Sequence, residues 1–383
     1  MTRKDTKLVG AGRTPALHAG AVNTPVYRAS TFLFPDVESM FDNSQPYTYG
    51  RRGTPTTRAL EDAFCELEGG ARTVLTPSGL SACTLAILAV CSAGDHLLVT
   101  DSVYGPTRVF CERIAKRYGV TTTFFAPSAG AKLKDQFRPE TKAVFLESPG
   151  SITFEVQDVP AIAKAAHEKG ITVILDNTWA TPLHFDAMGH GVDLSVQSAT
   201  KYAGGHADVM LGTVTASATY KDRLVQAHGD LGLCASADDA FLTLRGLRTL
   251  SVRLKRHQES ATELAIWLKG RPEVARVIYP PLHDDPGHTL WKRDFTGACG
   301  LFSIVLHQAS DKSVAAMLDG MKHFSLGYSW GGFESLILPA HYHRSFPKKF
   351  EGPLIRLHIG LENVDDLKVD LAAGLERLHA ERS

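Results

Sequence analysis

The sequence predicts an α/β protein in which a mostly parallel sheet carries helices on both faces and is followed by a smaller α+β C-terminal domain. Short apolar runs alternate with helical patterns between residues 72 and 215, and such alternation implies right-handed crossovers between parallel strands. The pattern becomes sparser after about residue 240. The chain has 383 residues, 44% of them hydrophobic, which is enough for a large core in two or three domains.

Seven short runs of apolar and β-branched residues have the length and composition of buried strands. They lie at 72–76, 96–100, 120–125, 142–147, 172–176, 194–198 and 209–215. Helical patterns separate several of them, at 79–94, 106–119 and 159–170. The last pattern is the clearest, because Pro160 lies near its start and Gly170 at its end.

The rest of the chain predicts two further parts. After the large sheet we expect one long helix over 237–270, strands at 274–279, 300–306 and 354–360, and helices at 311–319 and 364–380. The residues before 54 are rich in Pro, Gly, Thr and Tyr without periodicity, which indicates an extended arm. The predicted domains are therefore an N-terminal arm (1–53), a large domain (54–247) and a small C-terminal domain (248–383).

Composition excludes several classes of partner. The 41 Lys and Arg balance 41 Asp and Glu, so nothing indicates binding to nucleic acid or to an anionic membrane. The N-terminus has no signal-peptide pattern and no stretch of 18 apolar residues follows, so we expect a cytoplasmic protein. The six cysteines form no C-x-x-C pair and His341-Tyr342-His343 has no third ligand at a recognisable spacing, so we expect no metal. The ligand should be a small molecule.

One lysine, Lys201, stands three residues after the apolar run at 194–198. Ser198 and Thr200 place hydroxyls beside it, and the Gly204-Gly205 pair allows a flat or anionic group to approach the backbone. Ligands of open parallel sheets bind beyond the carboxyl ends of the strands. A lysine there suits pyridoxal 5'-phosphate (PLP), because its amine forms a Schiff base with the cofactor aldehyde once its pKa falls from about 10.4. The structural alternative is a solvated loop charge.

Other strand ends supply the remaining contacts that PLP requires. Asp176 closes the strand at 172–176 and offers a carboxylate for the pyridine nitrogen. Gly79 and Leu80 lie where a strand turns into a helix, a position suited to binding phosphate through backbone N–H groups. Tyr104 follows another strand and offers a ring to cover the cofactor. Each position also has a purely structural interpretation. Asp176 could cap or start a turn, Gly79 could simply allow the chain to turn, and Tyr104 could be a core residue.

These pieces, in this order, resemble the Cys/Met metabolism family of PLP enzymes, and the resemblance covers nearly the whole chain. The segments that carry it are YGRRGTPT (49–56), CELEGGA (65–71), FLESPGSITFEVQDVPAI (145–162), DNTWA (176–180), SATKY (198–202), RGLRTL (245–250), WKRDFTG (291–297), YSWGGFESL (328–336) and LIRLHIGLE (354–362). They are most similar to the bacterial members that cleave L-cystathionine at its β-carbon.

The resemblance implies PLP-dependent transferase fold type I (aspartate aminotransferase-like), with PLP bound in the large domain. It also implies an N-terminal arm that reaches a neighbouring subunit, and a homotetramer built as a dimer of dimers with active sites shared across the dimer interface.

The family roles pass to matching positions of this chain. The resemblance makes Lys201 the Schiff-base lysine, Asp176 the partner of the pyridinium nitrogen and Tyr104 the ring-stacking tyrosine. The phosphate cradle then consists of Gly79, Leu80, Ser198 and Thr200, completed from the adjacent subunit by Tyr49 and Arg51. Arg356 would bind the substrate carboxylate with its planar two-donor fork; by alternation alone it reads as a strand residue facing solvent.

Within the family, two segments favour cleavage at the β-carbon. Members acting at the γ-carbon usually carry Asn-Pro after Ser-Pro and a Ser-Leu-Gly-Gly segment, whereas this chain has SPGSIT and YSWGG, with Ser329 and Trp330. The Ala-Thr-Pro of DNTWATP is more typical of the γ-acting members.

The activity implied is a carbon–sulfur β-lyase that converts L-cystathionine to homocysteine, pyruvate and ammonia in methionine biosynthesis, with other cysteine S-conjugates as further substrates. The alternatives are a cystathionine γ-lyase or γ-synthase, an O-acylhomoserine sulfhydrylase, or a non-catalytic binding relative.

Overall fold

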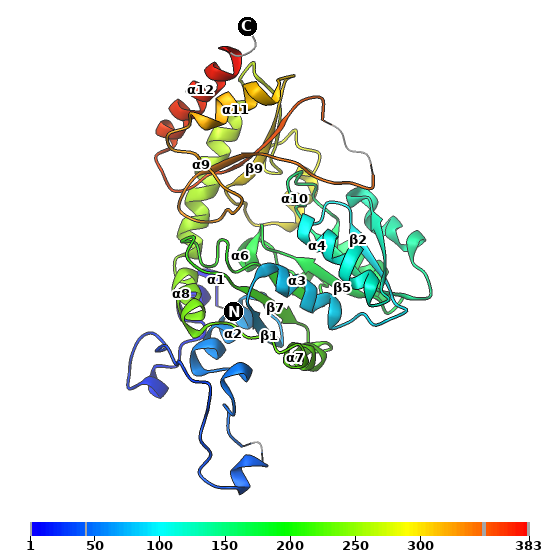
Figure 1. The fold of residues 1–383 in the computed structure, drawn as a ribbon, viewed down its shortest axis with the longest axis vertical. Coiled ribbons are helices and arrows are strands. Elements are labelled where there is room, and N and C mark those ends of the chain that lie inside the picture. Colours follow the sequence, from blue (N-terminus) through cyan, green and yellow to red (C-terminus); the bar gives the residue numbers. More distant parts are fainter. Residues whose placement is uncertain (1, 43, 347–349, 381–383) are drawn as a thin grey trace.

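The structure is a computed structural model that describes residues 2–42, 44–346 and 350–380 (Figure 1). Its α-helices are α1 (Lys4–Gly10), α2 (Pro55–Glu68), α3 (Gly79–Leu88), α4 (Gly105–Phe110), α5 (Val159–His167), α6 (Thr181–His184), α7 (Lys221–Asp230), α8 (Ala237–Leu247), α9 (Leu250–Lys269), α10 (His288–Asp294), α11 (Asp311–Asp319) and α12 (Val364–Ala380). Its strands are β1 (Arg72–Thr76), β2 (His96–Thr100), β3 (Thr121–Phe125), β4 (Thr141–Glu147), β5 (Thr172–Asp176), β6 (Leu194–Gln197), β7 (Gly212–Ala216), β8 (Val274–Ile278), β9 (Leu301–Leu306), β10 (Ser325–Leu326), β11 (Leu336–Pro339) and β12 (Leu354–His358).

The large sheet has seven strands in the order β1-β7-β6-β5-β4-β2-β3. β7 runs antiparallel to both of its neighbours, and the other pairs are parallel. Because β4, β5 and β6 are parallel neighbours, their carboxyl ends meet at one edge of the sheet. This confirms the predicted α/β class with a mostly parallel sheet.

Helices bury both faces of this sheet because alternate strand residues point to opposite sides. In β4, Phe145 belongs to a core cluster with residues of α3, whereas Leu146 belongs to a second cluster with residues of α2 and α5. The second cluster continues into the C-terminal part of the chain, where it includes Ile304 of β9 and Ile355 of β12. One continuous core therefore holds the two sheets together.

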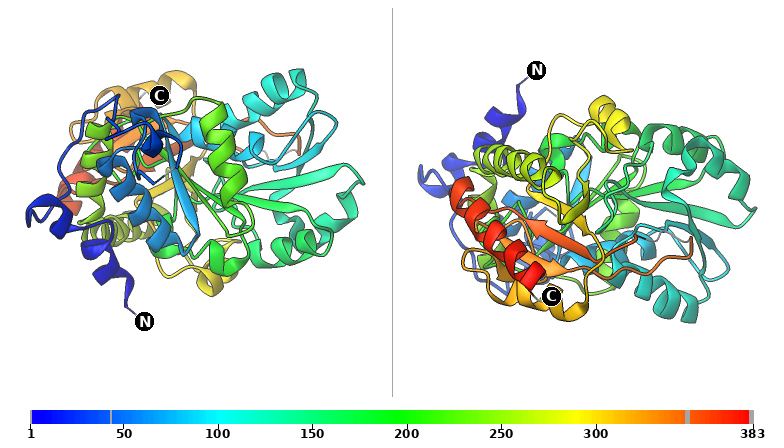
Figure 2. Two further views of the ribbon diagram at one scale, coloured as in Figure 1. Left: turned by 90° about the horizontal axis from the view of Figure 1, so that it is seen from below. Right: turned by 90° about the horizontal axis from the view of Figure 1, so that it is seen from above.

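The smaller sheet has five strands in the order β10-β11-β12-β9-β8. In Figure 1 it lies above the large sheet, and in the view from above in Figure 2 its strands and α12 lie toward the viewer. α11 packs on α12, and α9 packs on β8. The sheets agree with the predicted change of pattern after residue 240, while the exact domain boundaries stay a prediction. The predicted arm and C-terminal domain each include a few residues outside the described ranges.

The helix predicted over 237–270 is wrong as a single element, because α8 ends at Leu247 and α9 begins at Leu250. Close packing near the end of α8 accompanies the break. A Cβ on Gly246 would lie 2.4 Å from the carbonyl oxygen of Ala203, so α8 contacts the segment after Lys201 directly. Thr249 then leaves the helical conformation, with φ −111° and ψ 7°.

Five of the described α-helices were not predicted: α1, α2, α6, α7 and α10. Thr54 precedes α2 and forms a capping box with Thr57, and Gly69 follows the last residue of α2 in the left-handed conformation. α1 lies inside the predicted extended arm, where Leu8 is buried and its carbonyl accepts a hydrogen bond from Arg248. The remainder of the arm has only short turns and projects from the body of the molecule (Figure 1).

The described helices include none that is both long and apolar enough to cross a lipid bilayer.

Candidate active site

Lys201 lies just past β6, at the edge where the carboxyl ends of the parallel strands meet. Its Nζ donates a hydrogen bond to Ser329 Oγ at 2.7 Å and lies 5.5 Å from the centroid of the Trp330 ring. Burial, and after it the positive charge of Arg356, lowers the pKa of Lys201 to about 8, while Asp176 opposes the shift. The amine therefore loses its proton more readily near neutral pH than that of an ordinary lysine.

Asp176 lies at the end of β5, the strand next to β6. Its Oδ1 accepts hydrogen bonds from the backbone N–H of Thr178 at 3.0 Å and from the Thr178 hydroxyl at 2.6 Å. The same hydroxyl accepts a hydrogen bond from the backbone N–H of Ser198, so Thr178 links the carboxylate to residues 198–202, which we call the lysine segment. Cys83 Sγ lies 3.6 Å from Oδ2. Burial raises the pKa of Asp176, and the bonds from Thr178 oppose that shift.

A second carboxyl, Glu147, lies beside Asp176, because the two residues are paired in the register of β4 and β5. Glu147 Oε2 accepts a hydrogen bond from the backbone N–H of Tyr104 at 2.6 Å, and the Tyr104 side chain is 45% exposed at this edge. Burial and the nearby charge of Asp176 raise the pKa of Glu147 well above its usual value. Burial thus disfavours the charged form of both carboxyls, and the charge of Asp176 adds to this effect on Glu147.

The predicted phosphate cradle lies at the N-terminus of α3. Ser78 caps this helix by accepting a hydrogen bond from the backbone N–H of Ser81. A Cβ on Gly79 would lie 2.4 Å from Ser198 Oγ, so a glycine is needed for α3 to begin against the end of β6. Leu80 is partly exposed beside Gly79. These residues place backbone N–H groups and a hydroxyl together near Lys201.

Thr200 differs from the other cradle residues. Its hydroxyl donates to the carbonyl oxygen of Leu211 at 3.1 Å and accepts from the backbone N–H of the same residue at 3.0 Å. The structure thus uses this hydroxyl to hold the turn after Lys201 against the start of β7.

Arg356 reaches the site from β12 of the smaller sheet. Its Nη2 donates to the carbonyl oxygens of Tyr328 at 2.7 Å and Ser329 at 3.2 Å. Burial lowers the pKa of Arg356 to about 10, so the guanidinium is still charged at neutral pH. Arg356 therefore adds positive charge beside Lys201 and holds the segment that carries Ser329.

Tyr49 and Arg51 lie at the end of the N-terminal arm. Arg51 Nη1 donates to the carbonyl oxygen of Gly229 on α7 at 2.9 Å, and its guanidinium carbon lies 5.8 Å from the centroid of the Tyr49 ring. The Tyr49 side chain is half exposed. In the part of the chain that the structure describes, this pair is held by α7 and not by the group around Lys201.

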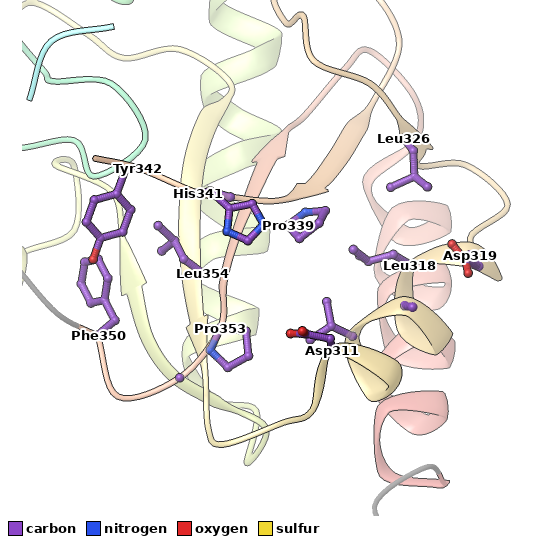
Figure 3. Close-up of a pocket in the computed structure, with 14 residues that line it drawn as sticks. Asp311, Leu318, Asp319, Leu326, Pro339, His341, Tyr342, Phe350, Pro353 and Leu354 are labelled. Carbon is purple, nitrogen blue, oxygen red and sulfur yellow. The ribbon is translucent and has the colours of Figure 1, made fainter. Parts of the chain in front are cut away.

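The residues around Lys201 fit PLP chemically. Burial disfavours the charge on Asp176, and a protonated pyridine nitrogen is the kind of cation that would offset this cost. Lys201 supplies an amine for the aldehyde, and the N-terminus of α3 supplies N–H groups for the phosphate. A separate cavity of about 500 Å³ lies between α11 and residues from 339–342 and 350–354 (Figure 3), and its lining includes none of the predicted site residues.

Sequence reasoning did not identify Thr178, Cys83 or Glu147. A signal existed for Thr178, because an Asp two positions before a Thr at a strand end favours an Asx turn. Cys83 lies four residues after Gly79 and so shares its helix face. Glu147 ends the strand next to that of Asp176, but strand order cannot be read from a single sequence with certainty.

Comparisons with known proteins agree with this geometry. The sequence matches the family described as "Cys/Met metabolism PLP-dependent enzyme" over residues 5–376. Cystathionine beta-lyase MetC of Escherichia coli K12 is 47% identical over 388 residues, covering 98% of each chain. L-alanine/L-glutamate racemase of Wolbachia pipientis wMel is 39% identical over 396 residues, covering 98% of each chain.

A crystal structure of cystathionine gamma synthase from Xanthomonas oryzae pv. oryzae in complex with cystathionine has a TM-score of 0.92 and 36% identity, covering 99% of each chain. The fold, the lysine-centred site and these matches together show that the chain belongs to the Cys/Met metabolism family of PLP-dependent enzymes.

Proposed function

We propose that this protein is a PLP-dependent carbon–sulfur β-lyase that cleaves L-cystathionine to homocysteine, pyruvate and ammonia. The observation that carries the proposal is the placement of the Lys201 amine against Ser329 and Trp330, with Arg356 beside it. The similarity to a cystathionine beta-lyase, that of Escherichia coli, supports the same activity.

Each site residue has a proposed task. Lys201 would hold PLP covalently, Asp176 would pair with its ring nitrogen and Tyr104 would cover its ring. Gly79, Leu80, Ser198 and Thr200 would surround the phosphate. When bound, PLP supplies an acceptor for the electrons of the broken Cα–H bond. Arg356 would bind the α-carboxylate of the substrate.

Lys201 would then move the protons of the reaction. With a pKa lowered to about 8, its neutral amine is available to remove the α-proton of the substrate. The resulting ammonium would donate that proton to the sulfur as the Cβ–S bond breaks, releasing homocysteine, and Ser329 Oγ, 2.7 Å from Nζ, would orient it. Water would complete the reaction by hydrolysing the remaining three-carbon fragment to pyruvate and ammonia.

The products test the proposal. L-cystathionine incubated with purified, PLP-loaded protein should give pyruvate and homocysteine. Formation of 2-oxobutyrate and cysteine would instead assign cleavage to the γ-carbon, and no turnover at all would favour a non-catalytic relative.

A second candidate activity is amino-acid racemisation, favoured by the 39% identity to the Wolbachia racemase. The same removal of the α-proton by Lys201 serves both reactions, but a substrate such as alanine has no leaving group at its β-carbon. Return of a proton to the opposite face would then give the D-amino acid. The test is whether L-alanine yields D-alanine at a rate comparable with pyruvate formation from L-cystathionine.

We further propose a cytoplasmic homotetramer, built as a dimer of dimers, in which Tyr49 and Arg51 complete the phosphate site of a neighbouring subunit. The arm supports this, because it exposes large apolar side chains that a partner could cover: Leu17, Leu33, Val37 and Phe41 are 70–87% exposed. The division into an arm (1–53), a large domain (54–247) and a small domain (248–383) belongs to the same proposal.

A further inference from the structure

A buried histidine on β12 contacts the backbone of the segment that carries Ser329 and Trp330. We call residues 328–332 the site segment. His358 lies two positions after Arg356, so both side chains leave the strand on the same face. His358 Nε2 lies 3.1 Å from the backbone nitrogen of Gly331 and 3.2 Å from the carbonyl oxygen of Gly332. Arg356 thus holds the first half of the site segment, and His358 holds the second half.

The other side of the same ring faces the lysine segment. His358 Nδ1 lies 3.5 Å from the hydroxyl of Tyr202, the residue directly after Lys201, and the two ring centroids are 5.8 Å apart. The Tyr202 hydroxyl is fixed in turn by a hydrogen bond from the backbone N–H of Gly300 at 2.9 Å. Tyr202 and His358 are both buried. His358 therefore lies between the two segments that must meet in the active site.

The backbones of these segments are also in direct contact. Gly331 has φ +86°, and a Cβ there would lie 2.7 Å from the backbone nitrogen of Tyr202 and 2.9 Å from the carbonyl carbon of Lys201. The site segment consequently has no free space in which to shift toward Lys201. The hydrogen bond between Lys201 and Ser329 depends on the position of this packed segment.

A neutral imidazole suits this place. Its Nε2 can accept from Gly331 while Nδ1 donates to Tyr202, or it can donate to Gly332 while Nδ1 accepts. A doubly protonated ring would direct an N–H at the N–H of Gly331. Burial, together with the neighbouring His257, lowers the pKa of His358 well below its usual value.

We propose that His358 is a positioning residue, which holds the site segment so that Ser329 Oγ meets Lys201 Nζ and Trp330 covers the lysine. This inference rests on the proposed β-lyase function for its kinetic consequence. The structural part of the inference, that the position of the site segment depends on one ring nitrogen of His358, does not rest on the proposed function.

Two amide substitutions separate the two sides of the ring. The amide of His358→Gln occupies roughly the place of Nε2, so it can keep a hydrogen bond to Gly331 or Gly332. The amide of His358→Asn occupies roughly the place of Nδ1, so it can keep the contact with Tyr202 but loses the hydrogen bond to Gly331 or Gly332 of the site segment. The two variants match in polarity and differ in which contact survives.

The first readout needs neither cofactor nor substrate. Trp330 emission is isolated in cofactor-free protein by subtracting the fluorescence of the same variant carrying Trp330→Phe. His358→Asn should alter this emission, and His358→Gln should retain that of the wild type.

The second readout is pyruvate formation from L-cystathionine. There His358→Asn should lower kcat by about 10- to 100-fold, the value of a hydrogen bond to a charged group, with KM little changed; His358→Gln should stay within about threefold.

Equal Trp330 emission and equal kcat in the two variants would overturn the proposal. Thermal melting identifies a variant that has not folded. Should His358→Asn fail this check, His358→Gln decides alone, because altered Trp330 emission in that variant contradicts the proposal. A wild-type protein that releases no pyruvate would refute the β-lyase function, while the fluorescence comparison would still test the positioning.

Discussion

Lys201 Nζ donates a hydrogen bond to Ser329 Oγ at 2.7 Å, although 128 positions of the chain separate the two residues. Lys201 follows a strand of the large sheet, whereas Ser329 lies between β10 and β11 of the smaller sheet. The site is therefore complete only when the two sheets are packed together. Loss of this packing should therefore abolish activity.

The covalent attachment of PLP can be tested directly. Borohydride reduction of the loaded protein should fix the cofactor mass on the peptide that contains Lys201, and Lys201→Ala should lose both the label and the yellow colour of the bound cofactor. Turnover should fall by at least about 10² to 10⁴, because the general base is gone. A label on a different lysine, or a colourless wild type that cannot be loaded with PLP, would contradict the assignment.

Asp176→Asn tests the partner of the ring nitrogen. The substitution keeps the shape of the side chain and removes its charge, so kcat should fall by about 10² to 10³ while PLP stays bound. Glu68→Gln is a suitable control, since Glu68 is a buried carboxyl that contacts Ser195 and Gln197 on β6 and has no proposed role in the reaction. A similar loss in both variants would indicate that Asp176 is only structural.

Arg356 has two tasks, and two substitutions distinguish them. Arg356→Ala should raise KM for L-cystathionine by orders of magnitude and also lower kcat, because the carbonyls of Tyr328 and Ser329 lose their donor. Arg356→Lys keeps a charge that can reach the substrate but has no planar fork. Compared with Arg356→Ala, it should therefore bring KM part of the way back to the wild-type value and restore kcat to a smaller extent. An unchanged kcat in Arg356→Ala would show that the guanidinium does not support the site segment.

The protonation of Lys201 predicts a pH dependence. In cofactor-free protein the folded-state pKa of Lys201 is about 8, below the usual lysine pKa of about 10.4, so the folded state binds fewer protons than the unfolded state between these values. Stability should therefore rise with pH across this window, and the penalty of a buried ammonium should be fully present below pH 8. Reattachment of PLP requires the neutral amine, and its rate should rise with a midpoint near pH 8.

Removing a nearby charge should move that midpoint. Arg356→Gln eliminates one cause of the lowered pKa of Lys201, so the midpoint of the reattachment rate should shift upward. Stopped-flow absorbance across a pH series measures both proteins under the same conditions. A midpoint that stays in place would mean that burial alone sets the pKa.

Sharing of the active site predicts complementation between inactive chains. Lys201→Ala and Arg51→Ala should each be nearly inactive alone. In a hybrid dimer, one site combines the intact Lys201 of one chain with the intact Arg51 of the other. Random pairing makes half of the dimers hybrid, so roughly a quarter of all sites should regain function after the proteins are refolded together. Inactivity after verified subunit exchange would place Arg51 in the site of its own chain.

Local patterns predicted much of the fold. The expected strands at 72–76, 96–100 and 172–176 coincide with β1, β2 and β5, and the expected helices at 311–319 and 364–380 coincide with α11 and α12. These elements have strong periodicity or composition of their own. The break between α8 and α9 could not be predicted in this way, because it accompanies the packing of Gly246 against a segment far away in sequence.

The residues of the candidate site also differ in whether a local pattern could identify them. Lys201 and Asp176 were identified from the sequence because Lys201 follows a recognisable strand and Asp176 ends another. Arg356 was proposed only through family resemblance, since alternation along β12 suggested a solvent-facing residue. His358 was not identified at all, because its importance comes from Tyr202 and Gly331, which reach it from two other parts of the chain.

α9 joins these distant parts at a fixed spacing. Near its beginning, Arg253 donates to the carbonyl oxygen of Tyr202, and one turn later His257 contacts the carbonyl oxygen of Ile359, directly after β12. The helix rises from the level of α8 to the smaller sheet (Figure 1). Because each residue of a helix adds about 1.5 Å of rise and about 100° of rotation, α9 sets the distance and the relative orientation of the lysine segment and β12, the strand that carries Arg356. Inserting a single residue into α9 between Arg253 and His257 would turn one of these side chains away from its partner. Lys201 and Arg356 would then no longer be held in their present relative positions.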